Sequence, residues 1–215
     1  MKKFSINKLI KNNRSFILFL ILYMFFRTAY ADWSPVPTGS MEPTILPGDY
    51  LWIDKTSFGP TMPFLNKQII TWGRPSRGDI ITFVPPHTED LYVKRVIAIP
   101  GDTIHIEGVK IYINGNLLEQ RLTEITSTAF IGRETIEGKD HHFKLSRNME
   151  IAYIGQSIKI PEGKYFVMGD HRNNSSDSRY WGFVDQENIM GKVTSIALSF
   201  SLKRDLFKRV ALSIE

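Results

Sequence analysis

A serine in a proline-bounded loop is the first candidate nucleophile of this 215-residue chain. Ser40 lies in the segment PTGSMEPT, directly after Gly39, whose backbone freedom can present the serine side chain outward. Thr38 adds a hydroxyl two residues earlier, where it could stabilise an oxyanion formed at Ser40. A Gly-Ser pair in a loop is more commonly an ordinary turn, so this segment indicates catalysis only together with a base.

A lysine inside an apolar pattern is the candidate base. Lys94 lies in the segment LYVKRVIAI, where strand alternation puts it on one face with Tyr92, Val96 and Ala98, and Arg95 on the other. Burial among apolar neighbours lowers the pKa of a lysine from about 10.4, as a base working near neutral pH requires. The commoner alternative is a strand lysine whose amine reaches solvent. A serine activated by a lysine is an established nucleophile.

A polar segment, GDHRNNSSDSRYWG, supplies a dense set of hydrogen-bonding side chains. As a solvated loop it would hold structural ion pairs, Asp177 with Arg179 and Asp170 with Arg172. His171, next to Asp170 and near Asp177, is the one histidine that would suit a Ser–His–Asp triad. The spacing of these acids and His171 matches no common metal site, so we expect no metal and no cofactor. The absence of cysteine excludes thiolate catalysis and disulfides.

The elements that position these segments read as β-strands. Runs of aromatic and β-branched residues between Pro and Gly turns predict strands at 50–53, 79–84, 92–99, 103–106, 110–113, 164–168 and 193–200. Asn114-Gly115 predicts a tight hairpin turn. The region 117–156 is polar, has only weak strand patterning and is interpreted as an insertion.

An apolar run follows a basic N-terminus. The segment FILFLILYMFF at 16–26 is shorter than the about 20 residues of a simple membrane span, and an extension to Ala31 includes Arg27. The positive-inside rule puts the N-terminus in the cytoplasm and the remaining chain outside. Ala29-Tyr30-Ala31 fits equally well the end of a cleavable secretory signal. Basic residues at both chain ends beside an apolar segment favour membrane lipid as a partner over nucleic acid.

The three chemical segments together resemble those of bacterial type I signal peptidases, membrane-bound serine endopeptidases with a Ser–Lys dyad. The stretches PTGSMEPTILPGD, YVKRVIAIPGD and GDHRNNSSDSRYWGFV occur in the family's order, and the resemblance covers nearly all of 32–200 except the insertion. It implies that Ser40 is the nucleophile and Lys94 the base. It also implies that the Thr38 hydroxyl joins the Ser40 N–H in an oxyanion hole.

The resemblance assigns supporting roles as well. Ser175 matches a serine that hydrogen-bonds and orients the lysine, Asp177 and Arg179 match a buried pair that shapes the site, and Arg95 follows the base as in the family. His171 stands where the family usually has Asn, which leaves the hydrogen bonding of that loop open. The insertion is shorter than in some relatives, and one anchor is visible where some have two.

The resemblance also implies a substrate and a place in the cell. Signal peptides of exported pre-proteins would add as extended strands beside the site and be cut after small residues in an A-x-A pattern. Shallow apolar pockets would be lined by Val36, Ile45 and Val93. The enzyme would be a single-pass protein of the bacterial inner membrane, with its N-terminus in the cytoplasm and its catalytic domain on the periplasmic side.

The expected fold is mainly β, a signal-peptidase-like β fold with an inserted smaller β subdomain and one N-terminal transmembrane helix. The chain would divide into a cytoplasmic basic N-terminus at 1–15, a transmembrane signal-anchor at 16–31, a catalytic β domain at 32–102 and 161–202, an inserted non-catalytic β subdomain at 103–160, and a basic C-terminal tail at 203–215.

Three alternatives stay open at this stage. One keeps the dyad but makes the protein a conjugation or pilus-processing peptidase of the same superfamily. Another is a self-cleaving transcriptional repressor, which would need a DNA-binding helix-turn-helix where this chain has an apolar segment. The third is a secreted β-rich binding protein whose signal is removed after Ala31.

Overall fold

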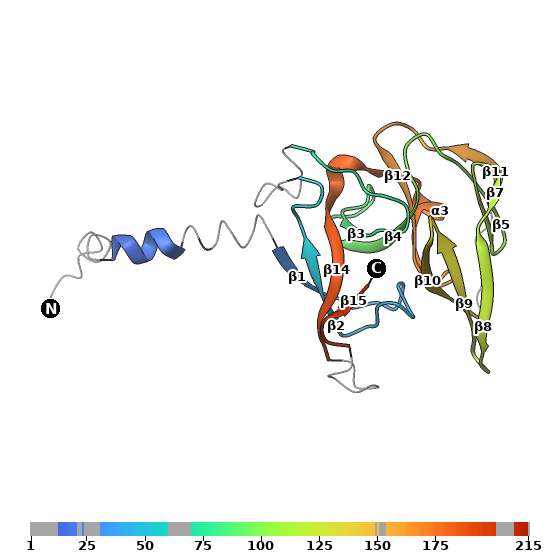
Figure 1. Cartoon of the computed structure of the whole chain (residues 1–215), viewed down its shortest axis with the longest axis horizontal. Coiled ribbons are helices and arrows are strands. Elements are labelled where there is room, and N and C mark those ends of the chain that lie inside the picture. The colour runs from blue at the N-terminus through green and yellow to red at the C-terminus, as the bar shows by residue number, and fades with distance from the viewer. Residues whose placement is uncertain are drawn as a thin grey trace.

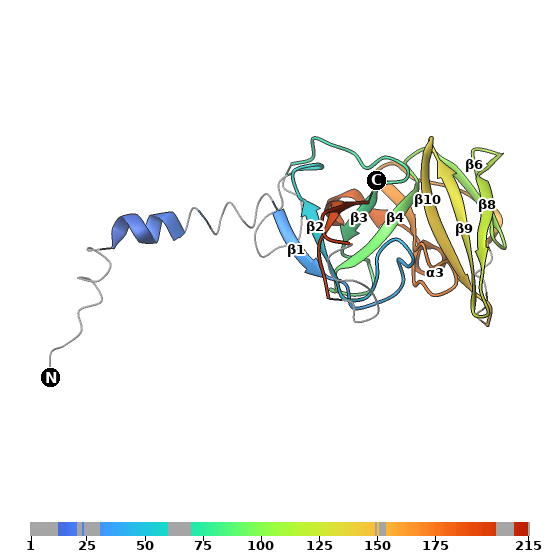
Figure 2. The same cartoon turned by 60° about the horizontal axis from the view of Figure 1, so that its bottom comes forward.

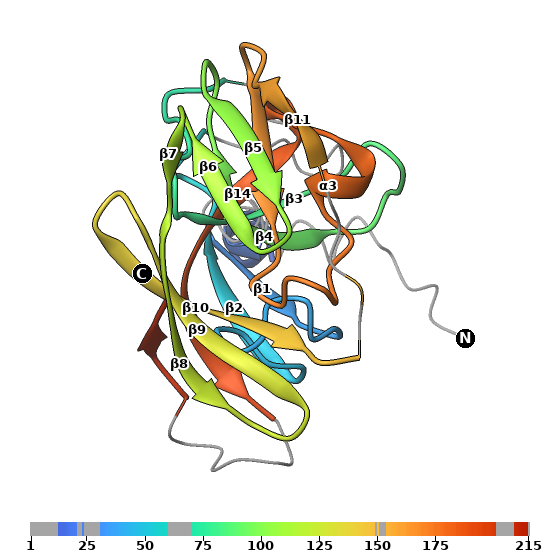
Figure 3. The ribbon, with the colours of Figure 1, turned by 90° about the vertical axis from the view of Figure 1, so that its right-hand side faces the viewer.

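Strands dominate the computed structural model, which describes residues 13–20, 23, 31–59, 70–148, 150, 154–200 and 209–214. They form three sheets, of eight, four and three strands (Figure 1). In Figures 1 and 2 the two smaller sheets lie together at one end of the large one. Seen from that end, the four-stranded sheet lies above the three-stranded one (Figure 3).

The large sheet carries the strands on both sides of the predicted insertion. Its order is β1-β2-β14-β3-β4-β12-β13, with β15 paired to β14, and the neighbouring strands are antiparallel. Its strands are β1 (Ala31–Pro35), β2 (Asp49–Asp54), β3 (Ile80–Phe83), β4 (Tyr92–Ala98), β12 (Lys164–Met168), β13 (Val184–Asp185), β14 (Ile189–Ser199) and β15 (Leu212–Ser213). A short helix, α3 (Ser178–Trp181), and a 3-10 turn, Gln186–Asn188, lie between β12 and β14.

The two smaller sheets are built from the chain between β4 and β12. The four-stranded sheet has the order β11-β5-β6-β7, and the three-stranded sheet has the order β10-β9-β8. Their strands are β5 (Thr103–Glu107), β6 (Lys110–Ile113), β7 (Asn116–Leu117), β8 (Glu119–Ile125), β9 (Ala129–Ile136), β10 (Lys139–Ser146) and β11 (Ile154–Lys159). The sheets thus change at the positions where the sequence predicts the domain boundaries, and the division into two domains stays a prediction.

The strong strand patterns are confirmed. β2, β3, β4, β5, β6 and β12 fall on the predicted runs, and β14 begins at Ile189 rather than at residue 193 because its start pairs with β3. The predicted hairpin turn joins β6 to β7, with positive φ angles of 54° at Asn114 and 81° at Gly115. A mainly β fold is therefore confirmed.

The insertion is more regular than its weak pattern indicates. β8 is exposed along most of its length, so it shows no alternation of apolar and polar residues. β9 and β10 do alternate, but two of their inward positions hold the charged or titratable side chains of Glu134 and His141. Because these buried positions hold polar residues, the alternation of apolar and polar residues that predicts a strand is interrupted in the sequence.

A buried ion pair fastens this hairpin to the polar segment after β12. Both guanidinium nitrogens of Arg172 donate to the Glu134 carboxylate, at 2.9 and 2.7 Å. Burial alone raises the pKa of Glu134, but Arg172 and His141 outweigh it and hold that pKa well below its usual range. Arg172 does not form the ion pair with Asp170 that the alternative of a solvated loop would hold, since its guanidinium reaches β9 and Asp170 binds Arg95 instead.

The two chain ends are described only in part. Residues 14–20 and Tyr23 are helical, while most of the predicted anchor at 16–31 lies outside the described residues. No helix within the described ranges is long and apolar enough to cross a membrane. In the predicted C-terminal tail, β15 pairs with β14, and Arg209 binds the buried Asp49 at 2.7 Å.

Replacing Glu134 with Ala should lower the free energy of unfolding by about 3–5 kcal/mol, because it leaves the Arg172 cation buried and unpaired. Urea unfolding of the purified chain measures the change. The control is Arg133→Ala, which removes the ion pair between Arg133 and Asp140. Because these two side chains are 52% and 50% exposed, this variant should lose at most about 1 kcal/mol of unfolding free energy. Equal effects of the two variants would show that the Glu134 pair does not fasten the hairpin.

Candidate active site

The loop between β1 and β2 presents Ser40 at the surface. Met41 and Ile45 are buried and pack with Val36 in one apolar cluster, which attaches the loop to the core of the large sheet. The Ile45 N–H donates to the Met41 carbonyl at 3.0 Å, and the Glu42 N–H donates to the Gly39 carbonyl at 3.1 Å. Ser40 itself stays partly exposed, as a nucleophile that must meet a substrate requires.

Lys94 reaches Ser40 from the neighbouring part of the sheet. It lies in β4 and is 4% exposed, and its Nζ is 2.8 Å from Ser40 Oγ. The amine also donates to the Val93 carbonyl at 3.0 Å and lies 5.3 Å from the centre of the Tyr92 ring. The fold therefore brings the predicted nucleophile and the predicted base into direct contact.

Burial makes the Lys94 ammonium group easier to deprotonate than an exposed lysine. Removal from water lowers the pKa of Lys94 to about 8, and the Arg179 guanidinium lowers it further. The carboxylates of Asp177 and Asp170 oppose this shift but do not cancel it. A neutral lysine amine can accept the hydroxyl proton of Ser40 across the 2.8 Å contact.

An open groove of about 700 Å³ runs past the two side chains. Residues 34–41 and 90–94 line it, together with Asn174 and Ser176. Val36 and Val93 line it as predicted, together with Met41 and Leu91, which the sequence argument did not assign. Ile45 does not line the groove, because it is fully buried beneath the loop.

Thr38 lies at the same face of the loop as the nucleophile. Its hydroxyl oxygen is 3.5 Å from Ser40 Oγ, and its side chain borders the groove. A hydroxyl at this distance is close enough to contact a group attached to Ser40. Its assignment to an oxyanion hole stays a prediction.

Asp177 and Arg179 form the predicted buried pair. Two contacts join the carboxylate and the guanidinium, at 2.8 and 2.7 Å, and both side chains are almost fully buried. Asp177 also accepts from the Arg179 N–H at the start of α3 and from the Gly169 N–H at 3.0 Å. This one carboxylate therefore fixes the segment that lies next to Ser40.

Arg95 has a structural task that the sequence did not specify. Its guanidinium binds both carboxylate oxygens of Asp170, at 2.9 and 2.8 Å, and donates to the Gly78 carbonyl at 2.8 Å. Thr44, four residues after Ser40, donates its hydroxyl to the same carboxylate at 2.5 Å. Asp170 therefore joins β4 to the loop that carries Ser40.

Ser175 lies close to the site without the predicted hydrogen bond. Its hydroxyl is buried and makes no hydrogen bond within the described chain. A Cβ on Gly169 would lie 2.3 Å from Ser175 Oγ and 2.4 Å from the Ser40 carbonyl oxygen, so only glycine allows this close approach. The role of Ser175 in orienting Lys94 stays a prediction.

His171 is not placed as the base of a triad. Its ring nitrogens are engaged with other groups, Nδ1 with the Gly39 carbonyl at 3.2 Å and Nε2 with the Ser146 hydroxyl at 2.8 Å. The contact to Ser40 Oγ is made by Lys94 instead. Among the described residues, no group of three or more potential ligands is placed to hold a metal ion.

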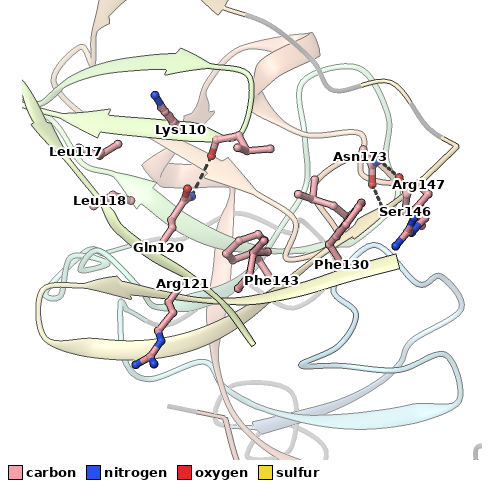
Figure 4. A pocket seen from close by; sticks show the side chains of 13 residues that line it. Lys110, Leu117, Leu118, Gln120, Arg121, Phe130, Phe143, Ser146, Arg147 and Asn173 are labelled. Carbon is pink, nitrogen blue, oxygen red and sulfur yellow. Dashed lines mark hydrogen bonds between the residues drawn. The ribbon is translucent and has the colours of Figure 1, made fainter. Parts of the chain in front are cut away.

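A second cavity, of about 560 Å³, lies in the insertion (Figure 4). Its wall is largely apolar and includes Phe130, Phe143 and Leu118. Its polar members include Ser146 and Asn173, which hydrogen-bond to each other. None of the residues lining it forms a pair of nucleophile and base, so the groove at Ser40 is the candidate active site.

A serine hydroxyl in contact with a buried lysine amine, on the wall of an open groove, defines the class of serine hydrolases that use lysine as the base. The chain matches the family model described as signal peptidase, peptidase S26, over residues 8–198. It belongs to this family.

Individual relatives agree with the family model. The chain is 32% identical to signal peptidase I of Pseudomonas fluorescens, over 89% of this chain and 73% of that protein. It is 35% identical to signal peptidase I of Rickettsia massiliae, over 86% of this chain and 78% of that protein. A solved structure of a signal peptidase I from Enterococcus faecalis is 32% identical and covers 58% of this chain and 100% of its own, with a TM-score of 0.38.

The rate of hydrolysis at Ser40 should rise with pH. Since the pKa of Lys94 is about 8 and only its neutral form accepts a proton, kcat/KM should be low below that pH and level off above it. Initial rates measured with a peptide substrate across this range give the midpoint. A midpoint at about 6.5 would indicate a histidine base and contradict the assignment.

Proposed function

We propose that this chain is a membrane-bound signal peptidase I that removes N-terminal signal peptides from exported pre-proteins, with Ser40 as nucleophile and Lys94 as general base. The single observation that carries the proposal is the 2.8 Å contact between the buried Lys94 amine and Ser40 Oγ. Membership of the signal peptidase family supplies the substrate class. The secreted binding protein and the self-cleaving repressor lack comparable support.

The reaction begins with proton transfer across the contact. Neutral Lys94 takes the proton of Ser40 Oγ while that oxygen attacks the scissile carbonyl carbon. The new ammonium group then protonates the leaving amine, and the peptide bond breaks to leave an acyl-enzyme ester. Lys94 next takes a proton from a water molecule that attacks this ester, and Ser40 regains its proton when the signal peptide leaves.

The developing negative charge needs donors near the scissile carbonyl. In this proposal the Ser40 N–H and the Thr38 hydroxyl supply them, since Thr38 lies beside Ser40 at the groove wall. Loss of one such donor typically costs about 3 kcal/mol of transition-state stabilisation. Because both donors belong to one loop, the conformation of that loop determines whether both can point at the oxyanion.

The groove suits an extended peptide with small side chains. Val36, in the chain after β1, and Val93, in β4, both line the groove and belong to one apolar cluster. We propose that a substrate lies along this surface as a further strand. We propose that cleavage follows small residues in an A-x-A pattern. Leu91 and Met41 add apolar surface along the same groove.

The test of the dyad is cleavage of a pre-protein by the full chain in detergent. Ser40→Ala and Lys94→Ala should each abolish detectable cleavage, because either change removes one side of the proton transfer. Ser127→Ala and Lys110→Ala serve as controls of the same residue types in the insertion and should cleave at the normal rate. Substantial cleavage by either dyad variant would refute the mechanism. Cleavage restricted to a single pilin-like substrate would favour the specialised peptidase.

We further propose that residues 16–31 anchor the enzyme in the bacterial inner membrane, with the catalytic domain on the outer side. The basic N-terminal flank of the apolar run supports this orientation. Trp33 and Trp52, on β1 and β2 just after the proposed anchor, are 49% and 39% exposed, and their rings are 6.0 Å apart. Exposed aromatic side chains suit the interface between lipid and water.

N-terminal sequencing of the protein in washed membranes tests the anchor. A retained N-terminus at or near Met1, resistant to alkaline extraction, is expected because an uncleaved apolar segment stays in the bilayer. A mature protein that begins at Asp32 and is released into the soluble fraction would show that the segment is a cleaved signal. Full cleavage activity in that soluble form would also remove the need for an anchor.

A further inference from the structure

The geometry points to His171 as a positioning residue that holds the Gly39–Ser40 peptide bond in the orientation needed for the oxyanion hole, with the inserted β9–β10 hairpin holding His171 in turn. This inference rests on the proposed function and assigns a task to a residue outside the dyad. It also gives the insertion a part in catalysis, although no described residue of 103–159 lines the groove.

His171 holds the chain on both sides of the proposed oxyanion donor. Its backbone N–H donates to the Ser40 carbonyl at 3.1 Å, and its ring Nδ1 contacts the Gly39 carbonyl at 3.2 Å. In a trans peptide the carbonyl and the next N–H lie in one plane and point in opposite directions. A fixed Gly39 carbonyl therefore fixes the direction in which the Ser40 N–H points.

The partners of the ring define its tautomer. Nδ1 has two neighbours, the Gly39 carbonyl at 3.2 Å and the Asn174 amide nitrogen at 3.4 Å. The carbonyl is the nearer and can only accept, so we assign the hydrogen to Nδ1, which donates to Gly39. Nε2 is then the acceptor for the Ser146 hydroxyl at 2.8 Å. Burial and the nearby Lys144 ammonium lower the pKa of His171, which keeps the ring in the neutral form that satisfies both partners.

The insertion holds this histidine through its backbone as well. β10 forms a parallel bridge between Lys144 and His171: the Lys144 N–H donates to the Asp170 carbonyl at 2.8 Å, and the Arg172 N–H donates to the Lys144 carbonyl at 2.9 Å. The backbone on either side of His171 is thus paired with one strand of the insertion. These pairs fix the backbone position of His171, and the contact of Nε2 with the Ser146 hydroxyl holds the ring itself toward Gly39.

Two side-chain contacts complete the attachment. Asn173 and Ser146 exchange hydrogen bonds at 2.8 and 2.6 Å, which fixes the serine that holds the ring (Figure 4). The Lys144 ammonium binds the Glu42 carboxylate at 2.5 Å, two residues after the nucleophile. β10 therefore contacts the Ser40 loop directly through Lys144 and indirectly through His171.

The experiment compares His171→Ala, His171→Asn and Ser146→Ala in the full-length enzyme with a pre-protein substrate. His171→Ala should lower kcat by about 100-fold with KM little changed, since a misdirected donor acts on the transition state rather than on substrate binding. His171→Asn should recover part of the loss because its amide can still donate toward Gly39. Ser146→Ala should give a smaller loss of kcat.

A second readout separates positioning from general packing. A peptide aldehyde that forms a tetrahedral adduct with Ser40 should bind His171→Ala more weakly by a factor similar to the loss in kcat, while an uncleavable substrate peptide binds normally. His142→Ala is the control. His142 also lies in β10, but its side chain is exposed, so this variant should retain full activity. Thermal unfolding of each variant checks the fold.

The outcomes distinguish this inference from the proposed function. A normal kcat in His171→Ala, or a loss carried entirely by KM, overturns the positioning role while the dyad stands. If His171→Ala does not fold, His171→Asn and Ser146→Ala are measured in its place. A lower kcat with little change in KM supports the positioning role, and a normal kcat or a change in KM alone overturns it. A wild-type enzyme that cleaves no pre-protein refutes the proposed function itself.

Discussion

The burial of one lysine amine is the constraint on which the active site depends. Lys94 is 4% exposed and contacts Ser40 Oγ at 2.8 Å. Lowering its pKa from 10.5 to about 8 corresponds to a relative cost on the order of 3 kcal/mol for the charged form. The fold must therefore supply enough packing around β4 to keep water away from an amine that prefers to be solvated.

The charges near Lys94 are arranged so that they do not cancel this effect. Asp170 is bound by Arg95, and Asp177 is bound by Arg179, so each nearby carboxylate already has a cation of its own. An unpaired carboxylate beside the amine would favour the ammonium form and remove the base. The same pairs also join β4, the Ser40 loop and the segment after β12, which links the electrostatics of the site to its geometry.

The insertion is attached directly to the loop that carries Ser40 and to the segment after β12. The buried pair of Glu134 and Arg172 fastens the β9–β10 hairpin to the segment after β12, and Lys144 binds Glu42 in the Ser40 loop. His171 lies between these two attachments and contacts the backbone on both sides of the nucleophile's N–H. In this way the insertion, of which no described residue lines the groove, can influence the orientation of the proposed oxyanion donor.

The sequence by itself determined the strands with a strong apolar pattern and the hairpin turn, because these depend on local features such as the alternation along β4 and the turn residues Asn114-Gly115. It also named Ser40 and Lys94 as the candidate dyad, through the resemblance of three segments in order and not through either segment alone. Only the tertiary structure decided which side chains meet. It paired Asp170 with Arg95, buried Ile45 below the groove and turned His171 toward Gly39. These contacts join residues far apart in the chain, and side-chain direction in an irregular loop follows no sequence period.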